Sequence, residues 1–103
     1  MIHVIAMIEL HPGTRDAFLN EFRRLIPDVH AEQGCIEYGP AIDAVTDIAN
    51  QSRYGPDTVV VVEKWADVAA LKAHSIAPHM DAYRVRVKDY VRHVDLRVLD
   101  PAG

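Results

Sequence analysis

Four consecutive valines, Val59 to Val62, constrain the fold of this chain more than any other feature of its sequence. β-branched side chains pack well on a pleated surface, so the run predicts a strand from Thr58 to Trp65. Successive side chains of a strand point to opposite faces of its sheet. Valines on both faces therefore predict apolar surroundings on both sides of this strand.

The first ten residues predict a second strand, from Ile2 to Leu10, with one entirely apolar face. That face carries Ile2, Val4, Ala6, Ile8 and Leu10. Ile5 and Met7 on the opposite face are also apolar, which again indicates cover on both sides.

A helix is predicted after the turn His11-Pro12-Gly13, with Thr14 as its N-cap. Its buried stripe follows helical spacing and consists of Phe18, Phe22, Leu25, Ile26 and Val29. Pro27 should kink the helix or convert its last turn, and Gly34 fits a position just past its end.

The remaining elements follow from turn residues and caps. A strand is predicted from Cys35 to about Val45, followed by a polar loop from Thr46 to Asp57. Asp67 should cap a helix that breaks at Pro78, where a second helical segment starts and runs to about Val87. Alternating side chains from Asp89 to Leu99 predict the last strand.

The order of these elements is βαββαβ, so the chain is expected to be an α+β protein with the ferredoxin-like fold. Its 103 residues suit a single domain, 1–103, with a four-stranded antiparallel sheet and helices on one face. Because the other face is apolar on the first and third strands, we expect a homodimer through sheet-to-sheet packing.

Composition argues against several classes of partner. A net charge of −4 without a long basic run argues against nucleic acid, and the cations Arg84, Arg86, Lys88 and Arg92 are interpreted as a solvated helix face. The single cysteine, Cys35, forms neither an internal disulfide nor a multi-cysteine zinc site. With no signal peptide and no membrane-spanning run expected, the predicted location is cytoplasmic.

Several motifs together resemble one known family. Pro12-Gly13-Thr14 precedes the first helix, Gly34-Cys35-Ile36-Glu37-Tyr38 leads into the second strand, and Glu63-Lys64-Trp65 is followed by His74 nine residues after the tryptophan. Over nearly the whole chain, this pattern resembles the antibiotic biosynthesis monooxygenase superfamily.

The resemblance implies a dimeric α+β barrel of ferredoxin-like subunits, with a small pocket between sheet and helices. Some members oxygenate phenols or quinols with O₂ and without metal or flavin, so the resemblance implies no cofactor. Haem-degrading members carry an asparagine where this chain has Ala6, and quinone-forming members carry one where it has Val61.

Three residues are the candidate catalytic set: His74, Glu63 and Trp65. His74 could accept the proton of a phenolic substrate, or it could be a core histidine. Glu63, if buried, would have a raised pKa and could act as a base; the alternatives are an ion pair with an arginine or a place at the sheet edge. Trp65 could stack on a planar substrate or anchor the core.

Three further residues are candidates for substrate binding: Tyr38, His79 and Tyr83. Tyr38 could donate its hydroxyl to a substrate or lie in the dimer interface. His79 and Tyr83 share a helical face and could form a second polar group of the pocket, or a capping contact. A metal site from His74 and His79 would need a third ligand, so no metal is expected.

The predicted function is therefore a cofactor-independent monooxygenase that oxidises a small phenolic or quinol-type compound with O₂. One alternative is an isomerase-type enzyme that uses the same acid and base on a small hydroxy-carbonyl compound. The other is a ligand-binding or stress-response dimer without turnover.

Overall fold

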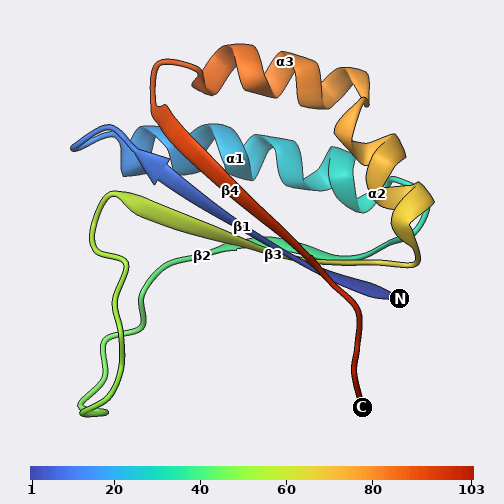
Figure 1. Ribbon diagram of the computed structural model, residues 1–103. Helices are drawn as coiled ribbons and strands as arrows, with labels where there is room; N and C mark the ends of the chain where they lie inside the picture. The colour runs from blue at the N-terminus through green and yellow to red at the C-terminus, as the bar shows by residue number, and fades with distance from the viewer.

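The computed structural model describes residues 1–103, and its elements follow the predicted order (Figure 1). The strands are β1 (Ile2–Leu10), β2 (Cys35–Ala41), β3 (Thr58–Trp65) and β4 (Val91–Leu99). The helices are α1 (Arg15–His30), α2 (Val68–Ser75) and α3 (Pro78–Val87). The predicted ferredoxin-like α+β fold is confirmed. Among the three helices, none combines the length and the hydrophobicity that a membrane span requires.

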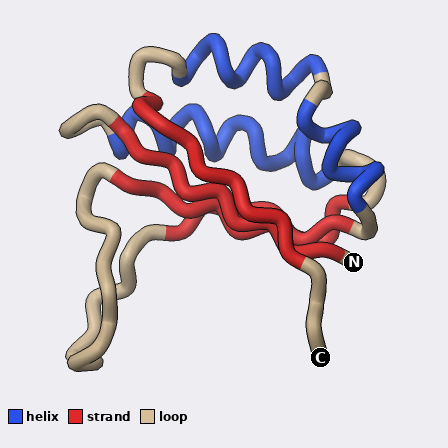
Figure 2. Tube along the Cα trace, viewed as in Figure 1, coloured by secondary structure: helices blue, strands red, loops and turns tan.

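The four strands form one antiparallel sheet in the order β2-β3-β1-β4. All three helices lie on one face of this sheet, as Figure 2 shows. Residues paired across strands share a face, so the register places Ala6 beside Val61 on β3 and Leu96 on β4. β2 and β4 are the two edges of the sheet.

The core lies between the sheet and the helices. The face of β1 predicted to be buried is buried at every position, from Ile2 to Leu10 in steps of two. Four residues of the predicted stripe of α1, together with Leu19, pack against it: Phe18, Leu19, Phe22, Leu25 and Val29. Ile26 is only partly buried at the margin of this core.

No helix covers the opposite face of the sheet. At its centre Ile5 pairs with Val62 and Met7 pairs with Val60 across β1 and β3. The Val62 side chain is 37% exposed, while the other three are half-buried by their neighbours within the sheet. The sequence pattern thus correctly placed apolar residues on both faces, and the chain itself covers one of them.

Local signals located most helix boundaries. The Asp67 carboxylate accepts a hydrogen bond from the Ala70 N–H at 2.8 Å, and Pro78 opens α3, both as predicted. Thr14 is at the N-cap position of α1, as predicted, but its side chain does not cap the helix. Its hydroxyl makes no capping bond and instead donates to the His11 carbonyl at 2.8 Å.

Two strand boundaries differ from the prediction. β2 ends at Ala41 rather than near Val45, because Ala41 is its last residue paired with β3, at Val60. The last strand begins at Val91 rather than Asp89. The Tyr90 N–H donates to the Val87 carbonyl and so continues the turn that ends α3.

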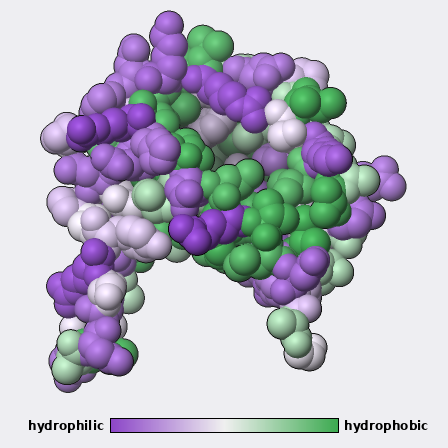
Figure 3. All heavy atoms as spheres, viewed as in Figure 1, coloured by the Kyte–Doolittle hydropathy of each residue, from purple (hydrophilic) through white to green (hydrophobic).

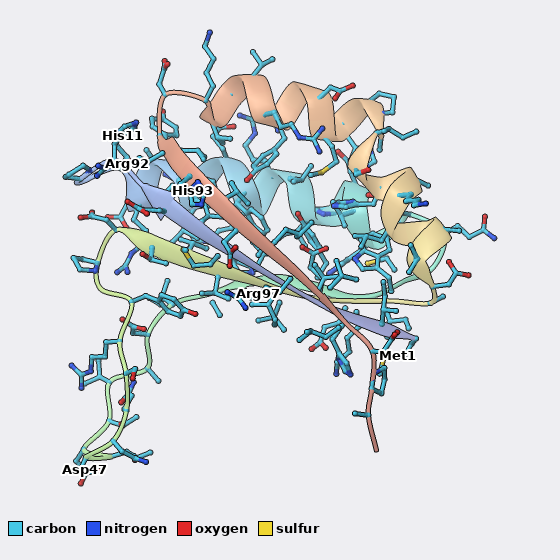
Figure 4. The ribbon with its side chains drawn as sticks, viewed as in Figure 1. Met1, His11, Asp47, Arg92, His93 and Arg97 are labelled. Carbon is cyan, nitrogen blue, oxygen red and sulfur yellow. The ribbon has the colours of Figure 1, made fainter.

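The segment from 42 to 57 forms an arm that projects from the uncovered side of the sheet. Its tip at Asp47 lies far from the helices in Figure 4. The Asp43 carboxylate closes the arm by accepting N–H bonds from Gly55 at 2.8 Å and Tyr54 at 3.1 Å. Those two bonds hold the pKa of Asp43 below its ordinary value.

Candidate functional site

A cavity of about 510 Å³ lies between the helix-covered face of the sheet and helices α2 and α3. Figure 3 shows a hollow at this level, above a cluster of apolar side chains. Its lining is mostly apolar and comprises Ala6, Ile8, Phe22, Tyr38, Val61, Glu63, Leu71, His74, Ser75, Met80, Tyr83, Arg84, Val87, Lys88, Val91, Val94 and Leu96. Apolar walls with a few polar groups are typical of small-molecule sites.

The exposure of the lining residues defines an inside and an outside. The outer rim consists of the exposed lining residues Ser75, Arg84, Lys88, Val94 and Leu96. The polar residues of the inner wall are Tyr38, Glu63, His74 and Tyr83, all of them buried. The rim opens beside β4, and no residue of the arm 42–57 lines the cavity.

Polar atoms of the inner wall are free to meet a ligand. Within the chain, the Tyr38 and Tyr83 hydroxyls form no hydrogen bond, and His74 and Glu63 each bond through one side-chain atom only. No fully buried side-chain nitrogen or oxygen lacks a partner, so these unused atoms reach open space. The cavity therefore combines hydroxyl donors with carboxyl and imidazole acceptors.

Glu32 fixes the orientation of the His74 ring. The Glu32 Oε2 atom lies 2.8 Å from His74 Nδ1 and 2.8 Å from His79 Nε2. A carboxylate can only accept here, so the Nδ1 atom of His74 carries the proton and donates. In neutral His74 the opposite nitrogen, Nε2, is then an unprotonated acceptor, the form that a general base requires.

The turn before β2 carries Glu32 to this position. Gly34 has a φ of +84°, and a Cβ atom there would lie 2.6 Å from the Cβ of Ala70 on α2. The Ala66 N–H also donates to the Gly34 carbonyl at 2.8 Å. Glycine thus allows the turn to pack directly on α2, the helix that carries His74.

Glu63 and Trp65 form a buried pair on β3. The Trp65 indole N–H donates to Glu63 Oε1 at 2.9 Å. Burial raises the pKa of Glu63 to about 7, against a lowering by the Trp65 bond and a further rise from the charge of Glu32. At neutral pH this carboxyl can therefore both give and take a proton.

Aromatic contacts hold the two tyrosines in place. Tyr38 stacks on Phe22 with ring centroids 5.4 Å apart and meets His74 edge-on at the same distance. Tyr83 meets Phe22 edge-on at 6.0 Å. Burial is the main reason that the pKa values of both phenols lie above their ordinary range, so they act as donors.

The sequence is similar to one family of proteins along almost its whole length. The model for "Antibiotic biosynthesis monooxygenase" matches residues 1–86. The protein named "Probable quinol monooxygenase YgiN" of Escherichia coli K12 is 40% identical over 103 residues, which cover 98% of each chain. The chain belongs to the antibiotic biosynthesis monooxygenase family.

Solved structures of similar proteins have the same fold. PA3566 from Pseudomonas aeruginosa is 25% identical, with a TM-score of 0.81, covering 99% of this chain and 94% of its own. Rv0793 from Mycobacterium tuberculosis is 27% identical, with a TM-score of 0.79, covering 99% and 95%. The expected family resemblance is therefore confirmed over almost the whole chain.

The structure brings together four of the six residues predicted for the site: Tyr38, Glu63, His74 and Tyr83 line the cavity. Trp65 does not, because its side chain is 0% exposed beneath Glu63 and His74, with its ring 4.6 Å from the His74 ring between centroids. A ligand in the cavity would therefore meet Glu63 and His74 rather than the indole face. His79 also lies outside the lining and bonds to Glu32.

Sequence patterns missed Glu32 and two cations of the rim. No pattern in the sequence predicts a role for Glu32, and no local spacing links it to His74, 42 residues away. Of the four cations interpreted as a solvated face, Arg84 and Lys88 line the cavity. Their spacing of four residues on α3 was the available signal. Within the whole chain, no group of three or more His, Cys, Asp or Glu residues is arranged to hold a metal ion.

Proposed function

We propose that this family member is a monooxygenase that oxidises a small quinol or phenolic compound with O₂ and without a cofactor. The observation that carries the proposal is the unpartnered Nε2 acceptor of His74, set by Glu32 and facing a mostly apolar cavity. The name of the relative that is 40% identical, a probable quinol monooxygenase, supports the substrate class.

In the proposed reaction, His74 Nε2 removes the proton of a substrate hydroxyl. The electron-rich anion then reduces O₂, and recombination forms a carbon–oxygen bond to a ring peroxide. Cleavage of the O–O bond leaves one oxygen on the ring and releases the other as water. For a benzene diol, quinol plus O₂ gives hydroxyquinone plus water, so O₂ takes four electrons from the substrate.

The inner wall offers a role for each remaining polar residue. The Tyr38 and Tyr83 hydroxyls, kept protonated by burial, can donate hydrogen bonds to the substrate oxygens or to the peroxide. Glu63 can supply the proton that the departing water needs. The apolar walls limit the access of bulk water to the intermediate.

Oxygen uptake tests the proposal directly. Chelator-treated protein should consume O₂ above the autoxidation rate with at least one member of a panel of reduced quinones and phenols. His74→Gln should lower the rate about 100-fold or more, the usual scale of general-base catalysis. His11→Gln, at an exposed position outside the cavity, is the matched control. Uptake at the background rate with every compound would overturn the proposal.

An isomerase-type reaction on a small hydroxy-carbonyl compound is the second candidate, because His74 and Glu63 provide an acceptor and a proton carrier in one cavity. It needs no O₂, so turnover that persists under anaerobic conditions would select it. Ligand binding without turnover is the third candidate. It predicts a bound compound that stays unchanged whether O₂ is present or absent.

We also propose that two copies pack through their uncovered sheet faces. The apolar centre of this face, formed by Ile5, Met7, Val60 and Val62, supports the proposal, since an exposed apolar patch favours a partner. Analytical ultracentrifugation should give twice the chain mass. Val62→Lys should produce monomers, whereas Val85→Lys, at an exposed position on α3, should not. A monomeric wild-type protein would contradict the proposal.

A further inference from the structure

The outer rim of the cavity carries two cations and no carboxylate. Arg84 and Lys88 are four residues apart at the end of α3, so both project on the same side of the helix. Glu63 is the only acidic residue among the lining residues, and it belongs to the inner wall. A ligand that enters the cavity therefore meets the cations of the rim first and reaches Glu63 and His74 of the inner wall last.

Lys88 differs from the neighbouring cations in having no ion-pair partner within the chain. Arg86 pairs with Glu21 at 2.9 Å, and Arg92 lies 3.7 Å from Glu9. Arg84 pairs with Asp81 at 3.1 Å. Lys88 has no carboxylate within ion-pair distance, so its charge is available to a ligand.

Arg84 holds the rim together. Its NH1 atom bonds to Asp81, and its NH2 atom donates to the Ser75 carbonyl at the end of α2, 2.8 Å away. A guanidinium group has five N–H donors, and these bonds use only part of them. Arg84 therefore braces α2 against α3 and still offers donors at the rim.

Apolar side chains lie beside the two cations. Val94 is 49% exposed and Leu96 is 56% exposed, although both are on the face of β4 that points toward the helices. This combination suits a ligand with a flat apolar body and an anionic group at one end. The body would lie against Val94 and Leu96, and its anionic end would remain in partly aqueous surroundings.

We propose that the site selects aromatic compounds that carry a carboxylate, with this group held at the outer rim by Lys88 and Arg84. The opposite end of the ring then points at the inner wall, where His74 and the tyrosine hydroxyls meet its hydroxyl groups. The proposal rests on the proposed function for its choice of an aromatic diol. It narrows that class to hydroxylated aromatic acids, with Lys88 as the specificity-determining residue.

Binding of unreactive analogues tests this selection independently of turnover. Benzoate and benzamide have nearly the same shape and differ in charge, so their Kd values can be compared by NMR titration. Wild-type protein should prefer benzoate by about two- to fivefold, the range of a partly screened ion pair. Added salt should reduce this preference, because the rim is exposed.

Charge variants identify the residue responsible. Lys88→Glu should weaken benzoate binding about tenfold or more and leave benzamide binding unchanged, while Lys88→Arg should retain the preference. Lys72→Glu makes the same charge change on α2 outside the cavity and is the matched control. Equal binding of the two analogues by wild-type protein would overturn the proposal, as would equal effects of Lys88→Glu and Lys72→Glu.

Oxygen uptake with 2,5-dihydroxybenzoate and with unsubstituted hydroquinone separates this inference from the proposed function. A KM that is lower for 2,5-dihydroxybenzoate than for hydroquinone, with this difference lost in Lys88→Glu, would support both the charge selection and the oxygenase reaction. A Lys88-dependent preference for benzoate without any oxygen uptake would support the charge selection and overturn the oxygenase reaction. Oxygen uptake with equal KM for both diols would overturn the charge selection alone.

Discussion

Glu32 accepts a hydrogen bond from His74 across 42 residues of sequence, with 2.8 Å between Oε2 and Nδ1. The contact joins the turn before β2 to helix α2. Its consequence is chemical as well as structural, because it determines which nitrogen of His74 faces the cavity as an acceptor. In the proposed reaction Glu32 would therefore act through His74, as a positioning residue.

Replacing Glu32 by glutamine should prevent His74 from acting as a base, while a side chain of similar size keeps the position of Glu32 filled. A glutamine amide can donate to Nδ1 and so favour the tautomer with the proton on Nε2, which cannot accept. We expect kcat for oxygen uptake to fall about 10²- to 10⁴-fold with a small change in KM.

Glu37→Gln is the matched control for this change, since Glu37 pairs with Lys64 and lies outside the cavity. Its kcat and KM should match those of the wild-type protein. If Glu32→Gln kept the wild-type kcat, or raised KM as much as it lowered kcat, a purely structural role for Glu32 would be the better explanation.

Glu63 should make stability depend on pH. Its pKa of about 7 in the folded protein lies above the ordinary value of 4.5, so the folded state binds more protons between these values. Stability should therefore fall as pH rises from about 4.5 to about 7 and then level off. Glu63→Gln should remove this fall and raise the free energy of unfolding at pH 8 by up to about 3 kcal/mol. Urea denaturation at a series of pH values measures both effects.

Trp65→Phe should show that the indole N–H lowers the pKa of Glu63. Loss of this donor removes the bond that lowers the Glu63 pKa, so that pKa should rise above about 7. The variant should also lose about 1–3 kcal/mol of stability, because a smaller ring leaves space in a fully buried site. A carboxyl NMR titration gives the pKa, and an unchanged value would show that the bond has no effect on the charge.

Gly34→Ala should destabilise the protein in two ways, by backbone strain at Gly34 and by a steric clash with Ala70. The φ of +84° strains any residue with a Cβ by about 1 kcal/mol or more, and the added carbon would meet Ala70 at 2.6 Å. Ala70→Gly removes the methyl group that would clash but itself weakens α2, so it is the reference for the double variant. Added to Ala70→Gly, the change Gly34→Ala should cost only the part due to backbone strain. Thermal unfolding of Gly34→Ala, Ala70→Gly and the double variant measures both costs, and equal stability of Ala70→Gly and the double variant would rule out backbone strain.

The sequence located the elements well wherever the signal was local and periodic. The alternation in Ile2 to Leu10 and the valine run at Val59 predicted β1 and β3 with their observed bounds. Boundaries without such a pattern were less accurate. β2 ended early because pairing with β3 stops at Ala41, and only the partner strand sets that limit.

The candidate site was predicted in part for the same reason. Glu63 and His74 could be proposed because strand alternation and a helix cap set the direction of each side chain relative to its own element. Their partners could not, since Glu32 reaches His74 only through the close packing of Gly34 on Ala70. Trp65 fitted a pocket role by sequence, yet packing buries it completely.

By itself, the sequence determined the order of the elements and the apolar character of both sheet faces, because these follow from periods of two and of 3.6 residues. The tertiary structure decided which side chains surround the cavity, which nitrogen of His74 is free, and that Lys88 reaches the rim without a partner. Such features depend on residues brought together from distant parts of the chain, and no local pattern specifies those distances.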